Sequence, residues 1–290
     1  MIVKKRLISI YLHIKATFEA RLAFLDQERP PVLVYQMDKV GSSTVYNSLL
    51  DMGLKNSIHH VHFLSVDLPE YRRRHELAGI FPAPYHIFLG EALSKVIAKR
   101  RGFPIKIISL VRDPVALVVS ALFENTYFNK ELLENDSDVI DPQKAIDQLE
   151  LYFQVPDNCS YIYDWFDREF KHVFGIDVFA TPFPVEKGYE VYSYNNVEAL
   201  VIRLEDLAEK GPKSIAAFLG LDAPLSLQLK NIRTEIKLSD SYQKVLNGIC
   251  LNKDLCGEIY SSRFVKHFYT DEMIEKFITK WSRSDSTGDA

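Results

Sequence analysis

Two short runs of this chain, PVLVYQ (31–36) and IKIISLV (105–111), are apolar and largely β-branched at successive positions. An alternating pattern is typical of a strand with one face in water, whereas a continuous pattern is typical of a strand covered on both faces, as in a parallel sheet. Similar runs occur at 57–64, 85–90, 199–204 and, more weakly, 176–180. The sequence therefore predicts a central parallel sheet.

Helical periodicity fills the segments between these runs. The predicted helices cover 43–53, 92–101, 114–126, 142–154, 159–173, 211–219 and 271–282. Strands that alternate with helices indicate a three-layer α/β domain with helices on both faces of the sheet. The stretch 129–198, rich in aromatic and acidic residues, predicts a helical insertion or cap. In such sheets ligands bind at the carboxyl ends of the strands, so the search for a site starts there.

Composition excludes several classes of protein. Hydrophobic residues make up 47% of the chain and charged residues 26%, which is enough to build a sizeable core. The net charge of −4 argues against non-specific nucleic-acid binding as the main task. The three cysteines are odd in number and form no CxxC pair, so we expect no disulfide framework and a cytoplasmic location.

The first 30 residues predict an amphipathic helix that ends near Pro30-Pro31. His13, Lys15, Glu19 and Arg21 interrupt its apolar positions before about 20 of them accumulate, so we expect no integral membrane segment. Two interpretations stay open. The helix packs on the domain, or it binds a partner or a membrane surface.

The hinge between the run at 31–36 and the next helix holds Lys39-Val40-Gly41-Ser42-Ser43-Thr44. The first amides of a helix have no partner within the helix, and the helix dipole favours negative charge there. Gly41 lets a ligand approach the backbone, while the three hydroxyls and Lys39 add donors. The pattern predicts an anion site, and an ordinary helix cap is the structural alternative.

The anion site differs from a nucleoside-triphosphate P-loop. The pattern GxxxxGK[ST] needs an earlier glycine, where this chain has Gln36, and a lysine after the second glycine, whereas Lys39 precedes Gly41. A kinase-like P-loop enzyme is therefore the second hypothesis.

Lys39-x-Gly41-Ser42-Ser43-Thr44 after a strand resembles the 5′-phosphosulfate loop of sulfotransferases that use 3′-phosphoadenosine 5′-phosphosulfate (PAPS). The family's loop usually reads (P)K-[ST]-G-[ST]-[ST], so Asp38 and Val40 depart from it. The resemblance implies a three-layer, P-loop-like fold with PAPS as co-substrate and without a metal. It also implies that the cofactor contacts Lys39, Val40, Gly41, Ser42, Ser43 and Thr44.

Arg112-Asp113-Pro114 follows the run at 105–111, and Ser120 comes eight residues after Arg112. This pair resembles the family's 3′-phosphate motif, in which an arginine at a strand end and a serine in the next helix hold the 3′-phosphate. Pro114 suits a first helical turn, and two donors at fixed separation would recognise the extra phosphate. A structural Arg-Asp pair is the alternative.

Later stretches extend the resemblance to roughly residues 30–282. DWFDREFKHVFGIDVF (164–179) and SSRFVKHFYTDEMIEKFITKW (261–281) resemble bacterial sulfotransferase-like proteins of the capsular polysaccharide synthesis type. We expect a single domain over 1–290. Its parts are an N-terminal helix (1–30), a nucleotide-binding core (31–128), the helical insertion (129–198), the C-terminal part of the core (199–282) and a frayed tail (283–290).

Sulfuryl transfer needs a base for the acceptor hydroxyl, and histidine suits that task near neutral pH. In SIHHVHFL (57–64), His60 and His62 share one face of a strand and His59 points to the other. The segment resembles the E-V-H-F-F stretch of heparan-type sulfotransferases, with His60 at the position of their catalytic glutamate. We expect His60 as base, His62 as its near equal, and Glu91 as a further candidate unless it caps the next helix. Buried neutral histidines are the structural alternative, and two histidines on one strand are too few for zinc.

Lys39 would balance the charge that develops on the leaving phosphate. Arg263 and Lys266 are candidates for the late basic loop that covers the 3′-phosphate in many family members, although its glycine-rich form is missing here. The run YRRRHE (71–76) is either a solvated face or a patch for an acidic acceptor. The stripe YIYDWFDREF (161–170) is either core or a platform for a sugar.

The first hypothesis is a PAPS-dependent sulfotransferase that acts on a hydroxyl-bearing acceptor, a saccharide or small metabolite. A non-catalytic nucleotide-binding protein of the same fold is the third. The sequence leaves the identity of the acceptor and the oligomeric state open.

Overall fold

The structure is a computed structural model that describes residues 2–65, 68–77, 81–124, 130–133, 139–228 and 236–282. The predicted tail at 283–290 and the last two residues of the predicted helix 114–126 lie outside these residues.

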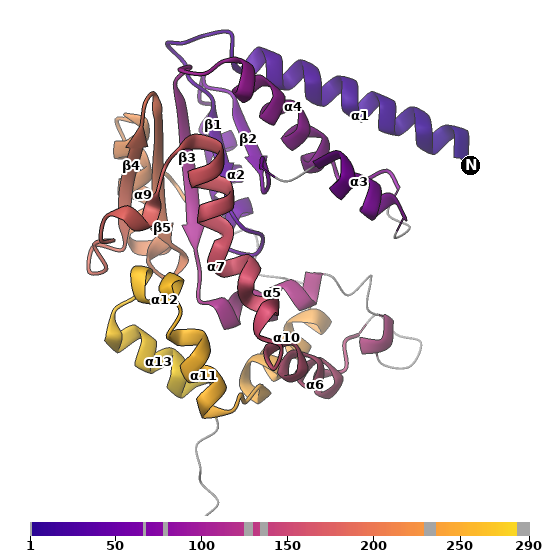
Figure 1. Cartoon of the computed structure of the whole chain (residues 1–290), viewed down its shortest axis with the longest axis vertical. Coiled ribbons are helices and arrows are strands. Elements are labelled where there is room, and N and C mark those ends of the chain that lie inside the picture. Colours follow the sequence, from indigo (N-terminus) through magenta and orange to yellow (C-terminus); the bar gives the residue numbers. More distant parts are fainter. Residues whose placement is uncertain are drawn as a thin grey trace, which may run out of the picture.

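A five-stranded sheet forms the centre of the molecule (Figure 1). Its strands are β1 (Val32–Tyr35), β2 (Ile58–Val61), β3 (Ile105–Val111), β4 (Tyr189–Tyr194) and β5 (Val197–Arg203). The order is β2-β1-β3-β5-β4, and every pairing is parallel except that of β4 with β5. The prediction of a largely parallel central sheet is therefore confirmed.

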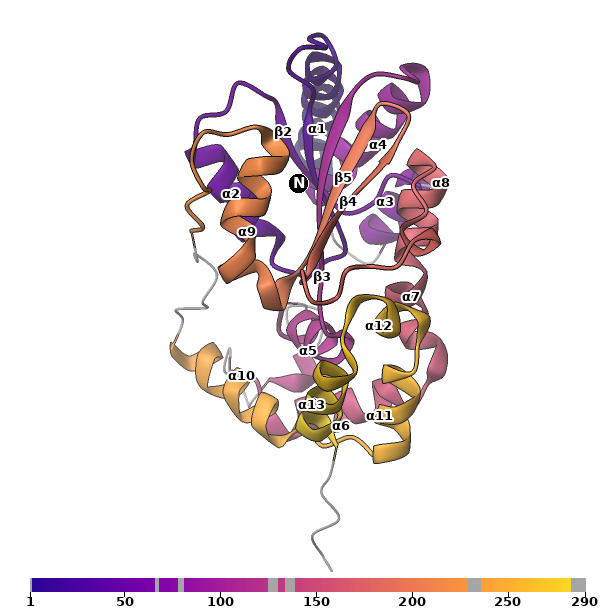
Figure 2. The same ribbon diagram turned by 90° about the vertical axis from the view of Figure 1, so that its left-hand side faces the viewer.

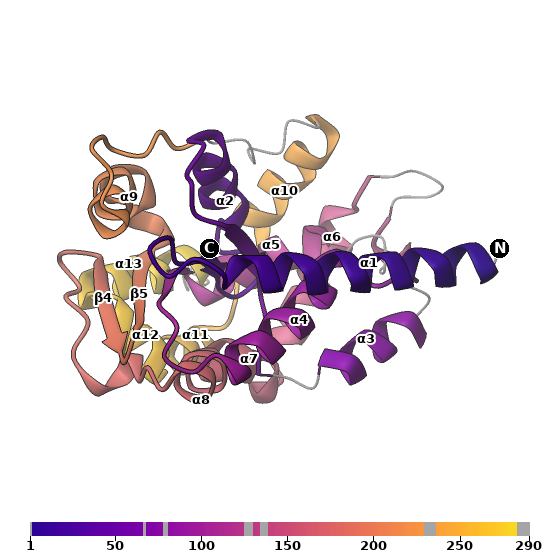
Figure 3. The ribbon, with the colours of Figure 1, turned by 90° about the horizontal axis from the view of Figure 1, so that it is seen from above.

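Helices cover both faces of the sheet, as the alternation of strands and helices predicts. One face is covered by α2 (Ser42–Asp51) and α9 (Leu204–Leu219), and the other by α4 (Tyr85–Lys99), α7 (Ser160–Phe166) and α8 (His172–Phe174), as Figures 2 and 3 show. Trp165, Phe166 and Phe170 are fully buried under the second face. The aromatic stripe at 161–170 is therefore mainly core.

A helical body lies beyond the carboxyl edge of the sheet (Figures 1 and 2). It consists of α5 (Pro114–Glu124), α6 (Pro142–Phe153), α10 (Ile236–Gly248), α11 (Lys253–Tyr260), α12 (Arg263–Phe268) and α13 (Asp271–Trp281). Short helical turns lie at Lys130–Leu132, Pro156–Cys159, Asp167–Lys171 and Val178–Ala180.

Two further helices, α1 (Ile2–Ala23) and α3 (Leu68–Leu77), pack against α4. Ala16, Ala20 and Ala23 of α1 are buried there. Among the described helices, not one combines the length and the apolar composition that crossing a bilayer requires.

Two predicted strands are wrong. Residues 85–90 begin helix α4, and residues 178–180 form a single helical turn. Helix α4 contacts α1, α3 and β2, and it buries seven successive residues from Ile87 to Leu93. A helix enclosed in this way has the same continuous apolar pattern as a buried strand.

Strand β4 was not predicted, although it lies inside the expected helical insertion at 129–198. It forms a hairpin with β5 in which Tyr194 pairs with Val197. The two connecting residues are Asn195 and Asn196, and Asn195 has a φ of 52°. Asparagine tolerates this conformation, and an Asn-rich pair between two strands is a hairpin signal that could have located β4.

Candidate functional site

The loop from Gln36 to Gly41, called here the Lys39 loop, leaves the carboxyl end of β1 and leads into α2. Two of its residues have left-handed backbone: Lys39 with φ of 67° and Gly41 with φ of 87°. This conformation is costly for a lysine, and such residues cluster at ligand sites. Left-handed and right-handed residues in succession also turn backbone N–H groups toward one point, which suits an anion.

Glycine suits position 41 better than any other residue. Besides its positive φ, a Cβ at this position would lie 2.7 Å from Cδ1 of Leu204, at the start of α9. Gly41 is also the N-cap of α2, and no side chain accepts a hydrogen bond from the first amides of that helix. The loop therefore presents helix amides that have no side-chain cap, as the sequence pattern predicts for an anion site.

Arg112 lies next to the Lys39 loop. It follows the carboxyl end of β3, the neighbour of β1 in the sheet, and its Nη1 donates a 2.7 Å hydrogen bond to the carbonyl oxygen of Lys39. The structure thus brings together the two motifs that the sequence places at separate strand ends. Lys39 and Arg112 contribute two positive charges to one edge of the sheet.

The other predicted cofactor residues lie where the sequence places them. Ser42 and Thr44 are largely buried in the first turn of α2, Ser43 is half-buried, and Val40 is fully buried, so only the backbone of Val40 could face a ligand. Ser120 is half-buried in α5. Their contacts with a nucleotide stay a prediction.

Three histidines gather beside the loop. The rings of His60 and His62 lie 4.6 Å apart, as expected for residues two apart on a strand, and the ring of His86 lies 5.3 Å from that of His62. Tyr46 of α2 stacks on His60 with ring centroids 5.4 Å apart. These residues, called here the histidine cluster, place imidazoles next to the Lys39 loop.

The hydrogen bonds of His62 fix its protonation state. One ring nitrogen, Nδ1, lies 2.9 Å from the carbonyl oxygen of Gln36, and the other, Nε2, lies 2.9 Å from Oδ1 of Asp38. Both partners are acceptors, so both nitrogens carry a proton and the ring is an imidazolium. His62 in this state cannot accept a proton from an acceptor hydroxyl.

The pKa shifts agree with this ion pair. Burial alone would lower the pKa of His62, but the hydrogen bond and the charge of Asp38 outweigh it, so the pKa lies above its ordinary value. The side chain of Asp38 is 52% exposed, and its hydrogen bond with His62 lowers its pKa. The charge of Asp38, the one carboxylate in the Lys39 loop, is therefore balanced by His62.

His60 is in the opposite state. Burial, together with the charge of His62, lowers the pKa of His60 to about 3, so its ring is neutral. Its Nε2 is covered and has no hydrogen-bond partner among the described residues. The structural alternative, a buried histidine whose nitrogens are all hydrogen-bonded, therefore does not hold for Nε2 of His60. A buried polar atom without a hydrogen bond is unusual and needs an explanation.

Sequence reasoning missed two members of this site, Asp38 and His86. His86 lies in the run 85–90, which was predicted to be a strand, but it is part of α4, and burial lowers its pKa to about 4. Asp38 stands where the family commonly has proline. An acid inside an anion-binding loop was the signal, because such a charge requires a nearby cation.

The position predicted for Glu91 is wrong. It lies neither at a strand end nor at a helix start but in the middle of α4, where it is 3% exposed. Its Oε1 lies 3.5 Å from Nη1 of Arg72, too far for a strong hydrogen bond. Arg72 thus turns inward, whereas Arg73 and Arg74 are exposed and pair with Glu70. A catalytic role of Glu91 stays a prediction.

Arg263 and Lys266 are exposed on α12. The guanidinium of Arg263 pairs with Asp167 and lies 4.0 Å from the centre of the Phe179 ring. These contacts belong to the face covered by α7, so the structure does not join Arg263 to the Lys39 loop. The role of Arg263 and Lys266 in covering a 3′-phosphate stays a prediction.

Two buried carboxylates hold the site's framework. Asp113 accepts hydrogen bonds from the Tyr260 hydroxyl at 2.6 Å and from Nε1 of Trp281 at 2.8 Å, which anchors α11 and α13 directly behind Arg112. Glu169 accepts from the amides of Leu64 and Ser65 at 2.9 and 3.0 Å, just after the histidines of β2. Both carboxylates therefore position the strand ends.

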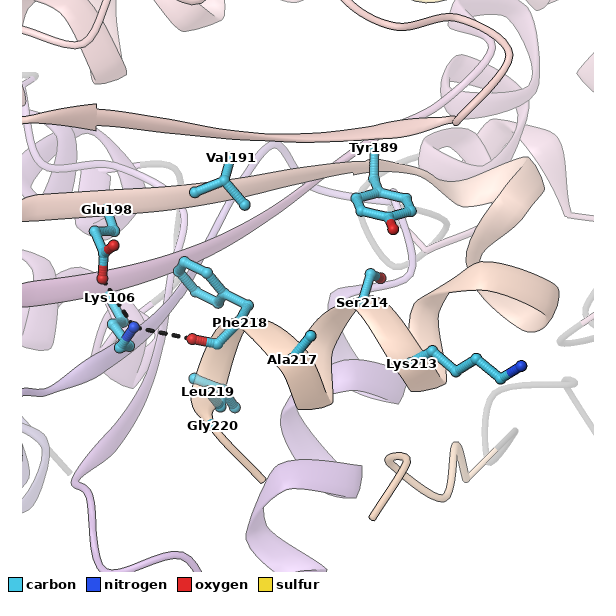
Figure 4. Close-up of a pocket in the computed structure, with 10 residues that line it drawn as sticks. All are labelled: Lys106, Tyr189, Val191, Glu198, Lys213, Ser214, Ala217, Phe218, Leu219 and Gly220. Atoms are coloured by element: carbon cyan, nitrogen blue, oxygen red, sulfur yellow. Dashed lines mark hydrogen bonds and ion pairs between the residues drawn. The ribbon is translucent and has the colours of Figure 1, made fainter. Parts of the chain in front are cut away.

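A cavity of about 730 Å³ lies at the opposite edge of the sheet, between β4, β5 and α9 (Figure 4). Nζ of Lys106 donates there to Oε2 of Glu198 at 2.8 Å and to the carbonyl of Phe218 at 2.9 Å, while Lys213 points away. The charge of Lys106 is thus already paired, and no residue of the Lys39 loop lines the cavity.

Comparison with known proteins gave one family match. Residues 136–270 match the family NKWYS, described as "Putative capsular polysaccharide synthesis protein". The match includes the stretch 164–179 that resembles bacterial proteins of this type, but neither Lys39 nor Arg112. It supports the polysaccharide-synthesis part of the resemblance. No curated protein and no solved structure matched the chain.

Proposed function

We propose that this protein is a PAPS-dependent sulfotransferase with a P-loop-like fold that transfers a sulfuryl group to a hydroxyl of a saccharide. The observation that carries the proposal is the contact between Arg112 and the Lys39 loop, which places the two phosphate motifs side by side at one sheet edge. The saccharide acceptor rests on the family match of residues 136–270.

The residues fit a doubly phosphorylated nucleotide. The start of α2 offers amides without a side-chain cap, Lys39 offers a point charge, and Arg112 offers a fork of N–H donors of which one is used by the loop carbonyl. The one carboxylate of the loop, Asp38, is balanced by His62. We assign the 5′-phosphosulfate to the Lys39 loop and the 3′-phosphate to Arg112 and Ser120.

The bound phosphosulfate would supply the sulfuryl group and a phosphate as leaving group. Lys39 and the amides of residues 41–44 would stabilise the negative charge on the leaving phosphate oxygen. His62, as an imidazolium, neutralises the charge of Asp38 beside the leaving phosphate and cannot serve as the base.

His60 is then the base in this proposal. Its neutral ring can accept the proton that the acceptor hydroxyl loses as its oxygen bonds to sulfur. Because the pKa of His60 is only about 3, it would accept this proton late, from a hydroxyl that is already losing it in the transition state.

A thermal-shift experiment tests the nucleotide site. We expect 3′-phosphoadenosine 5′-phosphate at about 100 times its Kd to stabilise the fold by about 2.7 kcal/mol, and ATP with Mg²⁺ to do little. Lys39→Ala and Arg112→Ala should abolish the shift, while Lys55→Ala and Arg101→Ala, at exposed positions, should preserve it. A larger shift with ATP and Mg²⁺ would favour a kinase-like enzyme instead.

A transfer assay tests the chemistry. PAPS with labelled sulfate is supplied together with a panel of saccharides and small hydroxyl compounds. His60→Ala should bind the nucleotide normally and lose turnover. If the protein binds the nucleotide but transfers sulfate to no acceptor, it is a non-catalytic nucleotide-binding protein of this fold.

A further inference from the structure

Helix α1 carries apolar side chains on two opposite faces. One face, with Ala16, Ala20 and Ala23, is buried against α4. The other exposes five large apolar residues, each between 48% and 62% accessible. These five residues, called here the apolar stripe, are Leu7, Tyr11, Ile14, Phe18 and Leu22.

The apolar stripe is continuous along the helix. Its members follow one another at intervals of three or four residues, which places them on one face over a length of about 23 Å. Figures 1 and 3 show α1 along the outer edge of the molecule, with its amino end directed away from the sheet. An exposed apolar surface of this length marks an interaction site.

The charges beside the stripe are basic. At 100° per residue, Arg21 and Lys15 flank the stripe on opposite sides. The one acidic residue of α1, Glu19, accepts a hydrogen bond of 2.5 Å from the Tyr85 hydroxyl, and its other oxygen lies 3.8 Å from Nζ of Lys15. A second copy of α1 would bring basic flanks against basic flanks, whereas paired helices place opposite charges there.

A groove of about 610 Å³ runs beside the stripe, between α1 and α3. Arg6 and His13 of α1 and Arg72 of α3 line it, with one acid, Glu76. The stripe residue Ile14 also lines this groove. Basic side chains therefore lie next to exposed apolar ones along one side of the helix.

We propose that α1 docks the protein on the surface of a bilayer that contains anionic phospholipids. The apolar stripe enters the boundary between headgroups and acyl chains, and Arg6, Lys15 and Arg21 contact the phosphates. The helix lies along the surface and does not cross it. This inference does not depend on the proposed transfer reaction.

Vesicle co-sedimentation of the full chain tests the proposal. The probes are vesicles of phosphatidylcholine alone and vesicles with about 30% phosphatidylglycerol. We expect binding to the anionic vesicles that weakens with added salt. The double variant Ile14→Glu/Phe18→Glu should lower the partition coefficient at least about tenfold. Leu151→Glu/Val155→Glu, at positions 64% and 49% exposed within and just after α6, should leave it unchanged.

A charge variant and light scattering complete the test. Arg6→Gln/Lys15→Gln/Arg21→Gln should lower binding to anionic vesicles at least about tenfold, since each basic residue near such a surface contributes about 1 kcal/mol. Circular dichroism checks that each variant is folded. The proposal is overturned if the protein does not bind anionic vesicles, or if the stripe variant binds as well as the unmodified chain. If the protein does not bind vesicles but forms a dimer, and Ile14→Glu/Phe18→Glu dissociates that dimer, then the apolar stripe binds a second copy of the chain.

Discussion

Nη1 of Arg112 donates a 2.7 Å hydrogen bond to the carbonyl oxygen of Lys39, although the two residues are 73 positions apart in the chain. The bond joins the carboxyl ends of β1 and β3, which are adjacent in the sheet. It holds a left-handed lysine in place and sets a guanidinium beside an uncapped helix start. The geometry of this edge therefore depends on both residues.

Arg112→Lys keeps the charge but removes the planar fork. We expect it to weaken binding of 3′-phosphoadenosine 5′-phosphate by about 10- to 100-fold, because charge-assisted hydrogen bonds contribute about 1.5–3 kcal/mol. The affinity for adenosine 5′-phosphosulfate, which lacks the 3′-phosphate, should fall by a smaller factor. Isothermal titration calorimetry measures both affinities, and Arg101→Lys, at an exposed position, is the control. An equal loss for the two ligands would argue against a 3′-phosphate at Arg112.

Asp38→Asn should change the charge state of the histidine cluster. Asp38 is the partner that raises the pKa of His62, so the variant should lower that pKa. NMR titration of the imidazole C–H signals reports this change. Asp26→Asn, in an exposed pair with Arg29, should leave them unchanged. An unshifted His62 would contradict the imidazolium assignment.

The sequence predicted the sheet and the position of the loop between β1 and α2 because these depend on local patterns. Continuous β-branched runs identified β1, β3 and β5, and the hinge residues 39–44 identified the start of α2. Helix α4 could not be separated from a strand, since its burial on several sides comes from α1, α3 and β2. That tertiary contact is absent from any local window.

The same limit applies to the site. That His60 and His62 share a face follows from strand alternation, but their opposite protonation states follow from Asp38 and from burial. The spacing of residues in the sequence predicts neither the ion pair of Asp38 with His62 nor the contact of His86 with His62. The contacts of Arg263 with Asp167 and Phe179 likewise depend on how α12 packs against the face of α7.

Stability should fall as the pH drops below 6.5. The folded pKa values of His60 and His86 are lowered to about 3 and about 4, so below 6.5 the unfolded chain binds protons that the folded chain does not. The contribution of these two histidines to the free energy of unfolding is present above pH 6.5 and is lost as the pH falls from 6.5 toward their folded pKa values. His62, with a raised pKa, contributes in the opposite direction, and its contribution is lost as pH rises through its folded pKa.

The variant His60→Gln should flatten this acid slope, by up to about 1 kcal/mol per pH unit below 6.5. Urea unfolding at several pH values measures the free energy of unfolding for each variant. His172→Gln, exposed on α8, should keep the slope of the unmodified protein. If the slope of His60→Gln also stays the same, the neutral state assigned to His60 is wrong.

Glu169→Gln should destabilise the fold by at least about 3 kcal/mol. The fully buried carboxylate accepts from the hydroxyls of Tyr35 and Ser65 and from the amides of Leu64 and Ser65. An amide group turns a donor toward donors and leaves buried groups unpaired. The control, Glu272→Gln, removes an exposed pair with Lys276 and should cost less than about 0.5 kcal/mol. Chemical denaturation compares the two, and similar costs would show that Glu169 does not hold the end of β2.

Gly41→Ala and Gly102→Ala should have similar effects on stability but different effects on binding. Both glycines have positive φ, 87° and 86°, so alanine costs about 1–2 kcal/mol at either position. A Cβ at position 102 meets nothing within 4 Å, whereas at position 41 it lies 2.7 Å from the end of the Leu204 side chain. That side chain can rotate, so the added cost in stability is small.

Alanine strains the backbone at position 41, where φ is 87°, and relaxation of that strain should misalign the amides of the loop. We expect Gly41→Ala to lower the affinity for 3′-phosphoadenosine 5′-phosphate at least about tenfold, because one charge-assisted hydrogen bond to a phosphate contributes about 1.5–3 kcal/mol. Gly102→Ala should bind as the unmodified protein does. Thermal unfolding gives the stability of each variant and calorimetry its affinity. Unchanged binding by Gly41→Ala would place the anion somewhere other than the start of α2.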